Sequence, residues 1–447
     1  MQAVQEVLEI VRKRDPDQKE FIQAVEEVLT SLVPILEKEP KYQKLLPLMI
    51  EPERVIMFRV PWVDDSGVIR VNRGFRVQFN SAIGPYKGGC RFRGNVNLSI
   101  LKFLGFEQVW KNSLTTLPMG GGKGGSDFDP SGKSDGEVMR FCQSFMIELQ
   151  RHIGPDCDVP AGDIGVGARE IGYMFGMYKR IRNNFEGVLT GKGIPYGGSL
   201  IRPEATGYGL IYFLVEMLKS RNQDLKGKRC MVSGSGNVAW GAIQKIIQLG
   251  GVPVTCSDSK GVLVFKDGMT MEHCEAMNKL KTQLRKPLSE YKATFPELSG
   301  FEYIPDKSVW AVEIPCEIAL PCATQNEIFP EHVPIMLKNG VKIVAEGANM
   351  PSTNETIELY IKNDIFYGPG KAANAGGVSV SGLEMTQNSM RLAWTREEVD
   401  EKLQSIMKRI FEAAYEASKL YNVPLYKGAN LAGFKRVAEA MLAYGCV

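Results

Sequence analysis

The segment from 229 to 249 constrains the fold most, because it places a glycine turn between a short apolar run and a helical pattern. Its turn has the spacing GxGxxA, formed by Gly234, Ser235, Gly236, Asn237, Val238 and Ala239. The first glycine permits a tight turn, the second lets backbone N–H groups approach a diphosphate, and the small last residue lets helix and strand pack closely. A strand, turn and helix in this order predict a βαβ unit that binds a dinucleotide.

An acidic residue follows this turn at the end of the next predicted strand. Asp258 stands about twenty residues beyond the turn, where a carboxylate usually bonds the ribose 2′-hydroxyl of NAD. Ser257, Ser259 and Lys260 beside it offer donors for the 2′-phosphate of NADP. These residues alone leave the choice between NAD and NADP open.

A lysine among glycines marks a second segment, far from the first in the sequence. Lys123 has five glycines around it within 120–125, behind Leu-Pro-Met. Glycines let a substrate approach the main chain, and an amine with little water around it loses its proton near neutral pH. Lys123 on this Gly-rich loop is therefore a candidate general base. A phosphate-binding P-loop is excluded because Gly124 stands where that motif needs Ser or Thr. A flexible linker fits the flanking residues less well, and a pyridoxal-binding lysine would call for a phosphate cup and a partner for the ring nitrogen, neither of which is recognisable.

Length and composition predict a soluble protein of two domains. The chain has 447 residues, of which 44% are hydrophobic and 23% are charged. A net charge of +3 gives no reason to expect nucleic acid or an anionic membrane as a partner. The first residues lack a signal-type apolar core and no run is apolar enough to span a bilayer, so we expect a cytoplasmic protein.

Cysteine and histidine patterns argue against a metal site. The nine cysteines include no CxxC pair, which suits reduced thiols used mostly as small core residues. His152, His273 and His332 each lack a nearby partner of the type that binds metals. No metal is expected.

Local patterns predict the elements of both halves of the chain. Helical spacing of apolar residues predicts a helix over 21–36, and Asn97 is expected to cap a helix that ends near 113. Short β-branched runs predict strands at 55–60, 68–71 and 75–79, separated by turns. In the second half we expect helices at about 202–220 and 238–249, with strands at 229–233, 252–257, 311–313, 318–320 and 342–345.

Five sequence blocks, in this order, resemble those of the small hexameric glutamate dehydrogenases, over nearly the whole chain. They are Gly84-Pro-Tyr-Lys-Gly-Gly, the segment Leu117 to Gly125, Pro160-Ala-Gly-Asp-Ile-Gly-Val-Gly, Arg202-Pro-Glu-Ala-Thr-Gly-Tyr-Gly and Asn374-Ala-Gly-Gly-Val-Ser-Val-Ser-Gly. Gly122 and the Ser-Asp-Ser at 257–259 look like those of the NADP-using members.

The resemblance implies an α/β fold of two domains with a cleft between them. An N-terminal α/β domain for substrate binding and oligomerisation would cover 1–200 and be completed by C-terminal helices at 380–447. A Rossmann-type dinucleotide-binding domain would cover 201–379.

The resemblance also implies which residues bind the substrate. Lys87 and Ser381 would hold the side-chain carboxylate of glutamate, and Gln108 and Lys111 would hold its α-carboxylate. The last two stand three residues apart, so they share one face of the predicted helix. Gly162 would contribute its backbone to the substrate pocket.

Proton transfer is assigned to two further residues by the same resemblance. Lys123 would help water attack the iminium carbon, and Asp163 would relay protons as ammonia leaves. Lys87 and Lys111, as neighbours of like charge, would lower the pKa of Lys123, and closure of the cleft would add to the shift. Asp163 alone, between glycines, would also suit a turn.

Cofactor contacts complete the implied site. Thr206 and Asn237 would contact the nicotinamide and diphosphate parts of NADP, and Asn349 and Asn374 would lie near the nicotinamide and the substrate.

The expected function is reversible oxidative deamination of L-glutamate to 2-oxoglutarate and ammonium by a homohexamer. The alternatives are an NAD-dependent enzyme of the same activity, a leucine- or phenylalanine-type dehydrogenase, and a catalytically silent dinucleotide-binding protein. Lys87 and Ser381 favour glutamate over the apolar amino acids.

Overall fold

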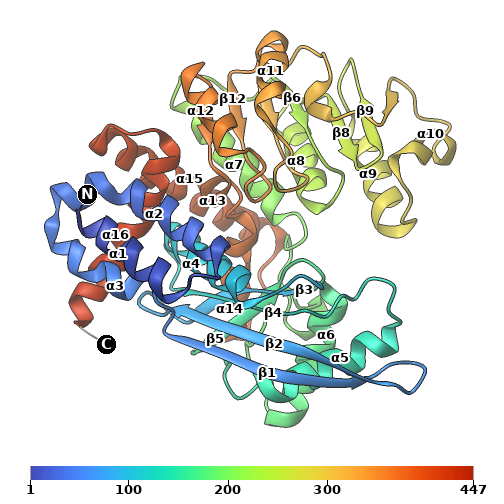
Figure 1. Cartoon of the computed structure of the whole chain (residues 1–447). Coiled ribbons are helices and arrows are strands. Elements are labelled where there is room, and N and C mark those ends of the chain that lie inside the picture. The colour runs from blue at the N-terminus through green and yellow to red at the C-terminus, as the bar shows by residue number, and fades with distance from the viewer. Residues whose placement is uncertain (1, 446–447) are drawn as a thin grey trace. The chain divides into compact units, whose positions relative to one another are not determined.

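The computed structural model describes residues 2–445 and contains two compact units, whose elements are labelled in Figure 1. The first unit comprises 1–200, 380–399 and 430–447, and the second comprises 201–379 and 400–429. Each unit holds a β-sheet with helices, so the predicted two-domain α/β fold is confirmed.

The second unit takes up a segment that the sequence prediction placed with the first. Residues 400–429 pack on the second unit because their side chains find partners there. The Tyr212 hydroxyl donates to Asp400 at 2.6 Å, Lys245 lies 3.3 Å from the same carboxylate, and the rings of Phe213 and Phe411 are 5.4 Å apart. The C-terminal tail is therefore shared between the units and does not belong to the first alone.

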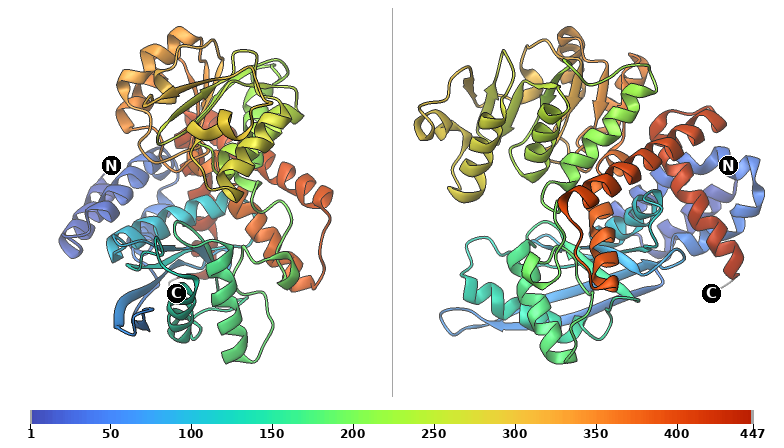
Figure 2. Two further views of the ribbon diagram at one scale, coloured as in Figure 1. Left: turned by 90° about the vertical axis from the view of Figure 1, so that its right-hand side faces the viewer. Right: turned by 180° about the vertical axis from the view of Figure 1, so that it is seen from behind.

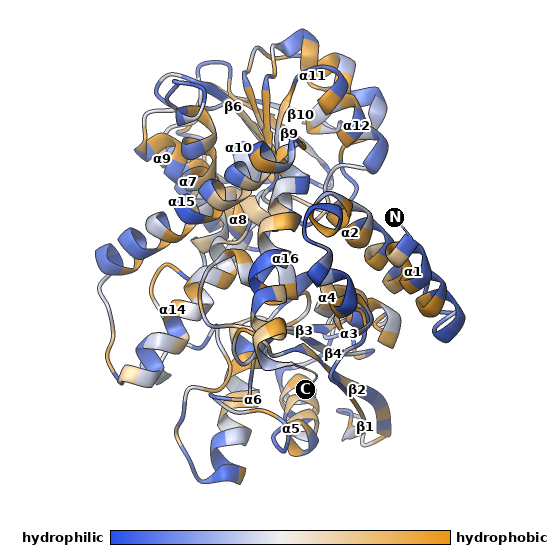
Figure 3. Cartoon of the chain, turned by 90° about the vertical axis from the view of Figure 1, so that its left-hand side faces the viewer, coloured by the Kyte–Doolittle hydropathy of each residue, from blue (hydrophilic) through white to orange (hydrophobic). Residues whose placement is uncertain are grey.

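The first unit begins with a helical layer. It contains α1 (Gln2–Arg14), α2 (Lys19–Lys38), a 3-10 turn (Pro40–Leu45) and α3 (Leu46–Met49). The predicted helix over 21–36 is confirmed as α2, and its predicted apolar stripe is buried. Figure 3 shows hydrophobic and hydrophilic residues alternating along α1 and α2, as expected for helices with one packed face.

A five-stranded sheet forms the centre of the first unit. Its strands are β1 (Arg54–Val63), β2 (Ile69–Asn80), β3 (Tyr86–Phe92), β4 (Gly121–Ser126) and β5 (Asp158–Gly162), in the order β1-β2-β4-β3-β5. β3 runs parallel to β4 and β5, whereas β2 is antiparallel to β1 and β4. The prediction of separate strands at 68–71 and 75–79 was wrong. Both belong to β2, because Asn72 and Gly74 pair with β1 and form no turn.

The predicted lysine loop is the strand β4, which corrects a second expectation. Its glycines are needed for packing and not for flexibility. A Cβ at Gly121 would lie 2.4 Å from a Val109 methyl group, and a Cβ on Gly88 of β3 would lie 1.7 Å from the Gly122 carbonyl oxygen. Only glycine lets helix and neighbouring strand approach this closely.

Helices cover both faces of this sheet. α4 (Leu98–Leu114) packs on β2 and β4, while α5 (Asp135–Leu149) and α6 (Ala168–Arg182) cover the other face (Figure 2). The predicted cap of α4 is confirmed, since the Asn97 side chain accepts from the N–H of Ile100 at 3.0 Å. Phe79 of β2 meets Phe106 of α4 on one face, and Phe92 of β3 joins the α5 and α6 core on the other.

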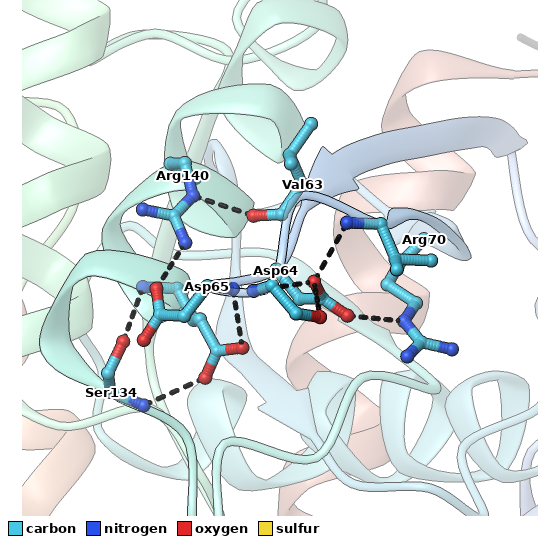
Figure 4. Close-up of polar contacts among 9 residues, drawn as sticks. Val63, Asp64, Asp65, Arg70, Ser134 and Arg140 are labelled. Carbon is cyan, nitrogen blue, oxygen red and sulfur yellow. Dashed lines mark hydrogen bonds and ion pairs between the residues drawn. The ribbon is translucent and has the colours of Figure 1, made fainter.

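The tip of the β1–β2 hairpin is fixed by charged side chains, which Figure 4 shows. The Asp64 carboxylate accepts from Arg70 Nε at 2.8 Å. Arg140 of α5 donates to the Val63 carbonyl oxygen and to the Asp65 carboxylate, both at 2.6 Å. The hairpin is therefore anchored to α5 at its tip.

The second unit begins with the predicted βαβ arrangement. α7 (Ala205–Lys219), β6 (Arg229–Val232) and α8 (Asn237–Gln248) confirm the expected helix, strand and helix. The main sheet is parallel and has the order β13-β12-β11-β6-β7, with β7 (Val252–Pro253), β11 (Ile318–Leu320), β12 (Ile343–Ala345) and β13 (Phe366–Gly368). A small antiparallel sheet contains β8 (Thr255–Asp258), β9 (Gly261–Val264) and β10 (Glu302–Pro305).

The other helices of the chain lie between these strands and at the C-terminal end. They are α9 (Met271–Asn278), α10 (Tyr291–Thr294), α11 (Val333–Asn339), α12 (Asn354–Lys362), α13 (Gly370–Ala373), α14 (Gly376–Met390), α15 (Arg396–Tyr421) and α16 (Leu425–Tyr444). Single 3-10 or π turns occupy Lys279–Gln283, Leu288–Glu290, Val309–Ala311, Pro330–His332 and, in the first unit, Ile194–Tyr196.

Two strand predictions in the second unit need correction. The run 252–257 is divided between two sheets, since β7 pairs with β6 while β8 pairs with β9. The expected strand at 311–313 is absent, because Val309–Ala311 forms a 3-10 turn that the Ser308 hydroxyl caps. The strands expected at 318–320 and 342–345 are confirmed as β11 and β12.

Cysteine burial follows the expectation drawn from composition. Among residues 2–445, seven cysteines are buried and Cys157 is exposed. Cys446 lies outside the described residues. Within the same range, no helix combines the length and the apolar character needed to cross a membrane.

Candidate active site

Lys123 lies in the middle of β4 and is buried, with 5% of its surface exposed. Gly105 of α4 lies over it, since a Cβ at that position would be in ordinary van der Waals contact with Lys123 Cβ, at 3.6 Å. α4 therefore packs over the lysine, and the rigid strand fixes where the amine lies.

Asp163 follows the last residue of β5 in a tight turn. The turn closes when the Val166 N–H donates to the Asp163 carbonyl oxygen at 2.9 Å, and Gly165 takes a φ of +73° beneath Phe92. A Cβ at Gly89 of β3 would lie only 2.8 Å from Asp163 Cβ. Glycine is therefore required at position 89 so that the Asp163 side chain can lie against β3. The partly buried carboxylate lies 3.3 Å from Lys123 Nζ.

Arg91 is the third charged member of this cluster, and the sequence prediction missed it. Its Nε donates to Asp163 Oδ2 at 2.7 Å, the same oxygen that faces Lys123. A signal existed, because Lys87 and Arg91 stand four residues apart on β3 and therefore share one face of a strand.

Burial lowers the pKa of the Lys123 amine, which Asp163 opposes and the charge of Arg91 reinforces. For Asp163, burial alone would raise the pKa, but the charges of Lys123 and Arg91 outweigh it and hold the pKa below its ordinary value. The contribution of Lys87 and Lys111 to the lowered pKa of Lys123 stays a prediction. The like charge in contact with the pair is that of Arg91.

A second cationic position lies on β3, four residues before Arg91. Lys87 is buried, with 1% of its surface exposed, and its Nζ donates to Thr190 Oγ1 at 2.7 Å. Thr190 was not predicted, since it lies in a loop with no pattern that separates it from other threonines. Together they place an ammonium group and a hydroxyl group side by side.

Gln108 and Lys111 lie on α4, on the row that begins at Gly105 above Lys123. Gln108 Nε2 donates to Asn112 Oδ1 at 2.7 Å, and Asn112 in turn donates to the carbonyl oxygens of Lys87 and Gly120. Buried Asn112 thereby ties α4 to β3 and orients Gln108. Both Gln108 and Lys111 are half-buried.

Ser381 is buried on α14, in the part of that helix that belongs to the first unit. Its neighbour Gly382 packs on the segment before β4, because a Cβ there would lie 2.5 Å from Leu117 Cδ1. Gly162, at the end of β5, pairs with Cys90 of β3 and precedes Asp163. All the residues predicted for proton transfer and substrate binding therefore belong to one unit.

The predicted dinucleotide turn lies in the second unit, between β6 and α8. Gly234 takes a φ of +84°, and its N–H donates to Ser257 Oγ at 2.9 Å. A Cβ on Gly236 would meet no atom within 4 Å, so the backbone there faces open space. A hollow of about 500 Å³ is lined by Gly234, Ser235, Gly236, Asn237, Val238, Ser257, Asp258, Ser259, Lys307, Ser308, Val309, Trp310, Cys322, Ala323, Thr324 and Glu327.

Asp258 borders this hollow, but both oxygens of its carboxylate accept hydrogen bonds. The backbone N–H groups of Lys260 and Leu288 donate at 2.9 and 2.8 Å, and Lys281 Nζ lies 3.2 Å away. Burial opposes ionisation, yet these donors keep the pKa of Asp258 below its ordinary value. Lys281 was not predicted, since its distance along the chain gives no local signal. Ser259 and Lys260 are exposed.

Thr206, Asn349 and Asn374 do not line this hollow. Asn374 Nδ2 donates to Asn349 Oδ1 at 2.7 Å, which brings these two together. Thr206 lies near the start of α7, where a Cβ on Gly377 would be 2.6 Å from its hydroxyl oxygen. Gly377 follows Asn374 by three residues, so the three predicted side chains gather around the start of α14.

Comparisons with known proteins cover both units. Residues 197–445 match the family model described as glutamate/leucine/phenylalanine/valine dehydrogenase, and residues 52–180 match the model for the dimerisation domain of the same group. The chain is 59% identical to an NADP-specific glutamate dehydrogenase of Giardia intestinalis, over all of this chain and 99% of that one.

Solved structures are similar over the same extent. A glutamate dehydrogenase of Plasmodium falciparum has a TM-score of 0.97 and 54% identity, covering all of this chain and 95% of its own. A hetero-hexameric glutamate dehydrogenase of Thermus thermophilus has a TM-score of 0.82 and 26% identity, covering 94% of this chain and 98% of its own.

Proposed function

Because the chain belongs to the glutamate/leucine/phenylalanine/valine dehydrogenase family, we propose that it is an NADP-dependent glutamate dehydrogenase. It interconverts L-glutamate with 2-oxoglutarate and ammonium. The observation that carries this proposal is the pair of buried Lys123 and partly buried Asp163, with a second buried cation, Lys87, on the neighbouring strand. The Lys123–Asp163 pair suits proton transfer, and Lys87 suits binding of the second carboxylate of the substrate.

The substrate is bound by the side chains around β3, β4 and α4. Lys87 and Ser381 hold the distal carboxylate, and Thr190 adds a hydroxyl group beside Lys87. Gln108 and Lys111 hold the α-carboxylate from one face of α4. The Gly162 backbone borders the same pocket. A dicarboxylate therefore has donors for both ends, which an apolar amino acid does not need.

Proton transfer uses Lys123 on β4 and Asp163 in the turn after β5. When bound, the cofactor supplies hydride acceptance in deamination and hydride donation in the reverse direction. Lys123, whose burial favours the neutral amine, takes a proton from the water that attacks the iminium carbon. Asp163, 3.3 Å from Lys123, passes a proton to the departing ammonia. The rigid strands keep both groups in place.

The residues of the second unit fit a dinucleotide. The positive φ of Gly234, the open space at Gly236 and the start of α8 at Asn237 form a turn whose N–H groups suit a diphosphate. Ser235 and Val238 line the same hollow. Thr206, Asn349 and Asn374 are assigned to the nicotinamide end.

The residues around Asp258, at the edge of the hollow, favour NADP over NAD. Asp258 is already bound by two backbone N–H groups and by Lys281, which offsets its charge. Exposed Ser259 and Lys260 then offer a hydroxyl group and a cation to the 2′-phosphate. A bare carboxylate in this place would instead repel that phosphate.

We also propose a cytoplasmic homohexamer. The Thermus thermophilus relative is hetero-hexameric, and the model matched by residues 52–180 is that of a dimerisation domain. The β1–β2 hairpin of the first unit exposes Met57 to 65% and Ile69 to 73%, with Val55 and Val71 also exposed. Such a surface suits a contact between subunits. The small net charge gives no ground for a nucleic-acid or membrane partner.

The proposal is tested by initial rates of reductive amination with 2-oxoglutarate and ammonium, measured in parallel with NADPH and NADH. We expect kcat/KM for NADPH to exceed that for NADH by about tenfold or more, because a charge-assisted contact to the 2′-phosphate is available only in NADPH. We expect 4-methyl-2-oxopentanoate to react more slowly than 2-oxoglutarate by a similar factor.

The matched control for cofactor choice is Lys260→Ala. It should raise KM for NADPH about tenfold and leave KM for NADH unchanged. A preference for NADH would retain the reaction and reject NADP. Faster turnover of the branched-chain keto acid would favour the leucine or phenylalanine type, and no turnover with any substrate would favour a silent dinucleotide-binding protein.

Replacing Arg91 with leucine tests the electrostatic account of Lys123. Arg91 helps keep the pKa of Lys123 low and also binds the carboxylate that Lys123 faces. Without it, Asp163 acts on Lys123 alone, so the pKa of Lys123 rises. The acid limb of kcat/KM for glutamate oxidation, which requires the neutral amine, should move to higher pH. Arg93→Leu, which removes an exposed cation two residues away, should leave that limb in place. An unmoved limb in Arg91→Leu would contradict the account.

A further inference from the structure

A buried ion pair outside the reacting groups joins a short loop of the first unit to α14. Lys192 Nζ lies 2.9 Å from Glu384 Oε1, and the two side chains are 1% and 0% exposed. Glu384 also accepts from the backbone N–H groups of Gly191 at 2.9 Å and of Lys192 at 3.3 Å. Lys192 Nζ also donates to the Leu189 carbonyl oxygen and to Asn388 Oδ1. The loop is thus bound to the helix by charged and neutral hydrogen bonds.

The backbone of this loop has a shape that needs such contacts. Leu189 takes a φ of +62° and Gly191 takes a φ of +86°. Left-handed backbone is sterically unfavourable for leucine, so a buried leucine keeps it only where the surroundings determine it. The bonds from Lys192 and Glu384 to Leu189 and Gly191 act on these two residues directly.

The residue between them is Thr190, whose hydroxyl group accepts from Lys87 at 2.7 Å. The N–H of Thr190 donates to the Pro160 carbonyl oxygen on β5 at 2.9 Å, so the loop is fixed to the sheet as well. On the helix side, Glu384 stands three residues after Ser381, about one turn along α14. The ion pair therefore links the segment that carries Thr190 to the helix that carries Ser381.

We propose that the Lys192–Glu384 ion pair is a positioning device for substrate specificity, which fixes Thr190 relative to Ser381 and so defines the pocket for the distal carboxylate. This inference rests on the proposed function, since only a dicarboxylic substrate has that second carboxylate. A buried ion pair contributes little net stability compared with apolar residues of similar volume, because desolvation offsets the attraction. What it supplies is one defined geometry, which a specificity pocket requires.

The test compares Glu384→Gln with Thr190→Val, which alters the pocket directly. Glutamine retains an oxygen for the Gly191 N–H but loses the charge that faces Lys192. We measure kcat and KM for 2-oxoglutarate and for 2-oxopentanoate, which has a methyl group in place of the distal carboxylate. In Glu384→Gln, KM for 2-oxoglutarate should rise about tenfold with little change in kcat. The preference for 2-oxoglutarate over 2-oxopentanoate should fall by the same factor, while KM values for ammonium and NADPH stay within about twofold.

The control is Lys102→Met, which removes another buried lysine of this unit, 2.8 Å from Asp15. It disrupts another ion pair of a buried lysine but should keep the substrate preference. An equal loss of preference in this control would overturn the inference, because it would indicate general loosening. So would a folded Glu384→Gln enzyme with wild-type preference beside a Thr190→Val enzyme that has lost it.

If Glu384→Gln does not fold, Asn388→Ala retains both charges and removes one contact of Lys192, with an expected loss of preference of about threefold. Wild-type preference in that variant also counts against the inference. A wild-type enzyme without turnover of 2-oxoglutarate would instead refute the proposed function, which is a separate result.

Discussion

Replacing Lys123 with methionine is expected to lower kcat for glutamate oxidation about a thousandfold or more. Methionine has similar length and suits a buried position, so the strand and its packing on α4 should persist. It has no proton acceptor, and therefore the attacking water keeps its proton. NADPH binding, measured by fluorescence titration, should be unchanged because the dinucleotide turn belongs to the second unit.

Lys133→Met is the matched control for this experiment. It makes the same substitution at an exposed lysine in the loop after β4, and turnover should stay within about twofold. Circular dichroism would show that both variants are folded. Turnover by Lys123→Met within tenfold of the wild type would rule out Lys123 as the general base.

Replacing Asp163 with asparagine is expected to lower kcat by about 10²- to 10⁴-fold, since the proton relay to ammonia is lost. The substitution also removes the negative charge that stabilises the protonated amine of Lys123. The pKa of Lys123 should therefore fall further. The acid limb of the residual kcat/KM should move to lower pH, opposite in sign to the shift expected for Arg91→Leu.

Asp129→Asn serves as the control, because this exposed aspartate lies in the loop after β4 and bonds Ser131, outside the Lys123–Asp163–Arg91 cluster. Its pH profile should match that of the wild type. A shift of the Asp163→Asn limb to higher pH would contradict the assigned electrostatics. Wild-type kcat in Asp163→Asn would remove the aspartate from proton transfer altogether.

Local patterns predicted the elements that depend on neighbours in the sequence. The helical spacing over 21–36 gave α2, Asn97 gave the cap of α4, and the GxGxxA turn gave β6 and α8. Each of these signals extends over only a few residues, so it can be recognised in a single sequence. The resemblance to a known family added the site residues, and no single spacing indicated which lysines lie close together.

The local sequence pattern gave the wrong secondary structure at two segments that contain glycine. The glycines around Lys123 indicated a loop, but they form β4, because the close approach of Val109 and of β3 excludes any side chain. Asn72 and Gly74 indicated a turn, but cross-strand pairing with β1 extends β2 through them. Contact with distant segments decided both cases, and the sequence shows no such contact directly.

The amino-acid sequence by itself determined the two-domain α/β fold, the dinucleotide turn and the presence of the lysines and aspartate. Only the tertiary structure decided that Arg91 is a like charge acting on Lys123 and a hydrogen-bond donor to Asp163. The same holds for Thr190 beside Lys87 and for the ion pair of Lys192 with Glu384, whose partners are 192 residues apart. Electrostatic interactions depend on distance and burial in space, and these are fixed only when the strands pair and the helices pack.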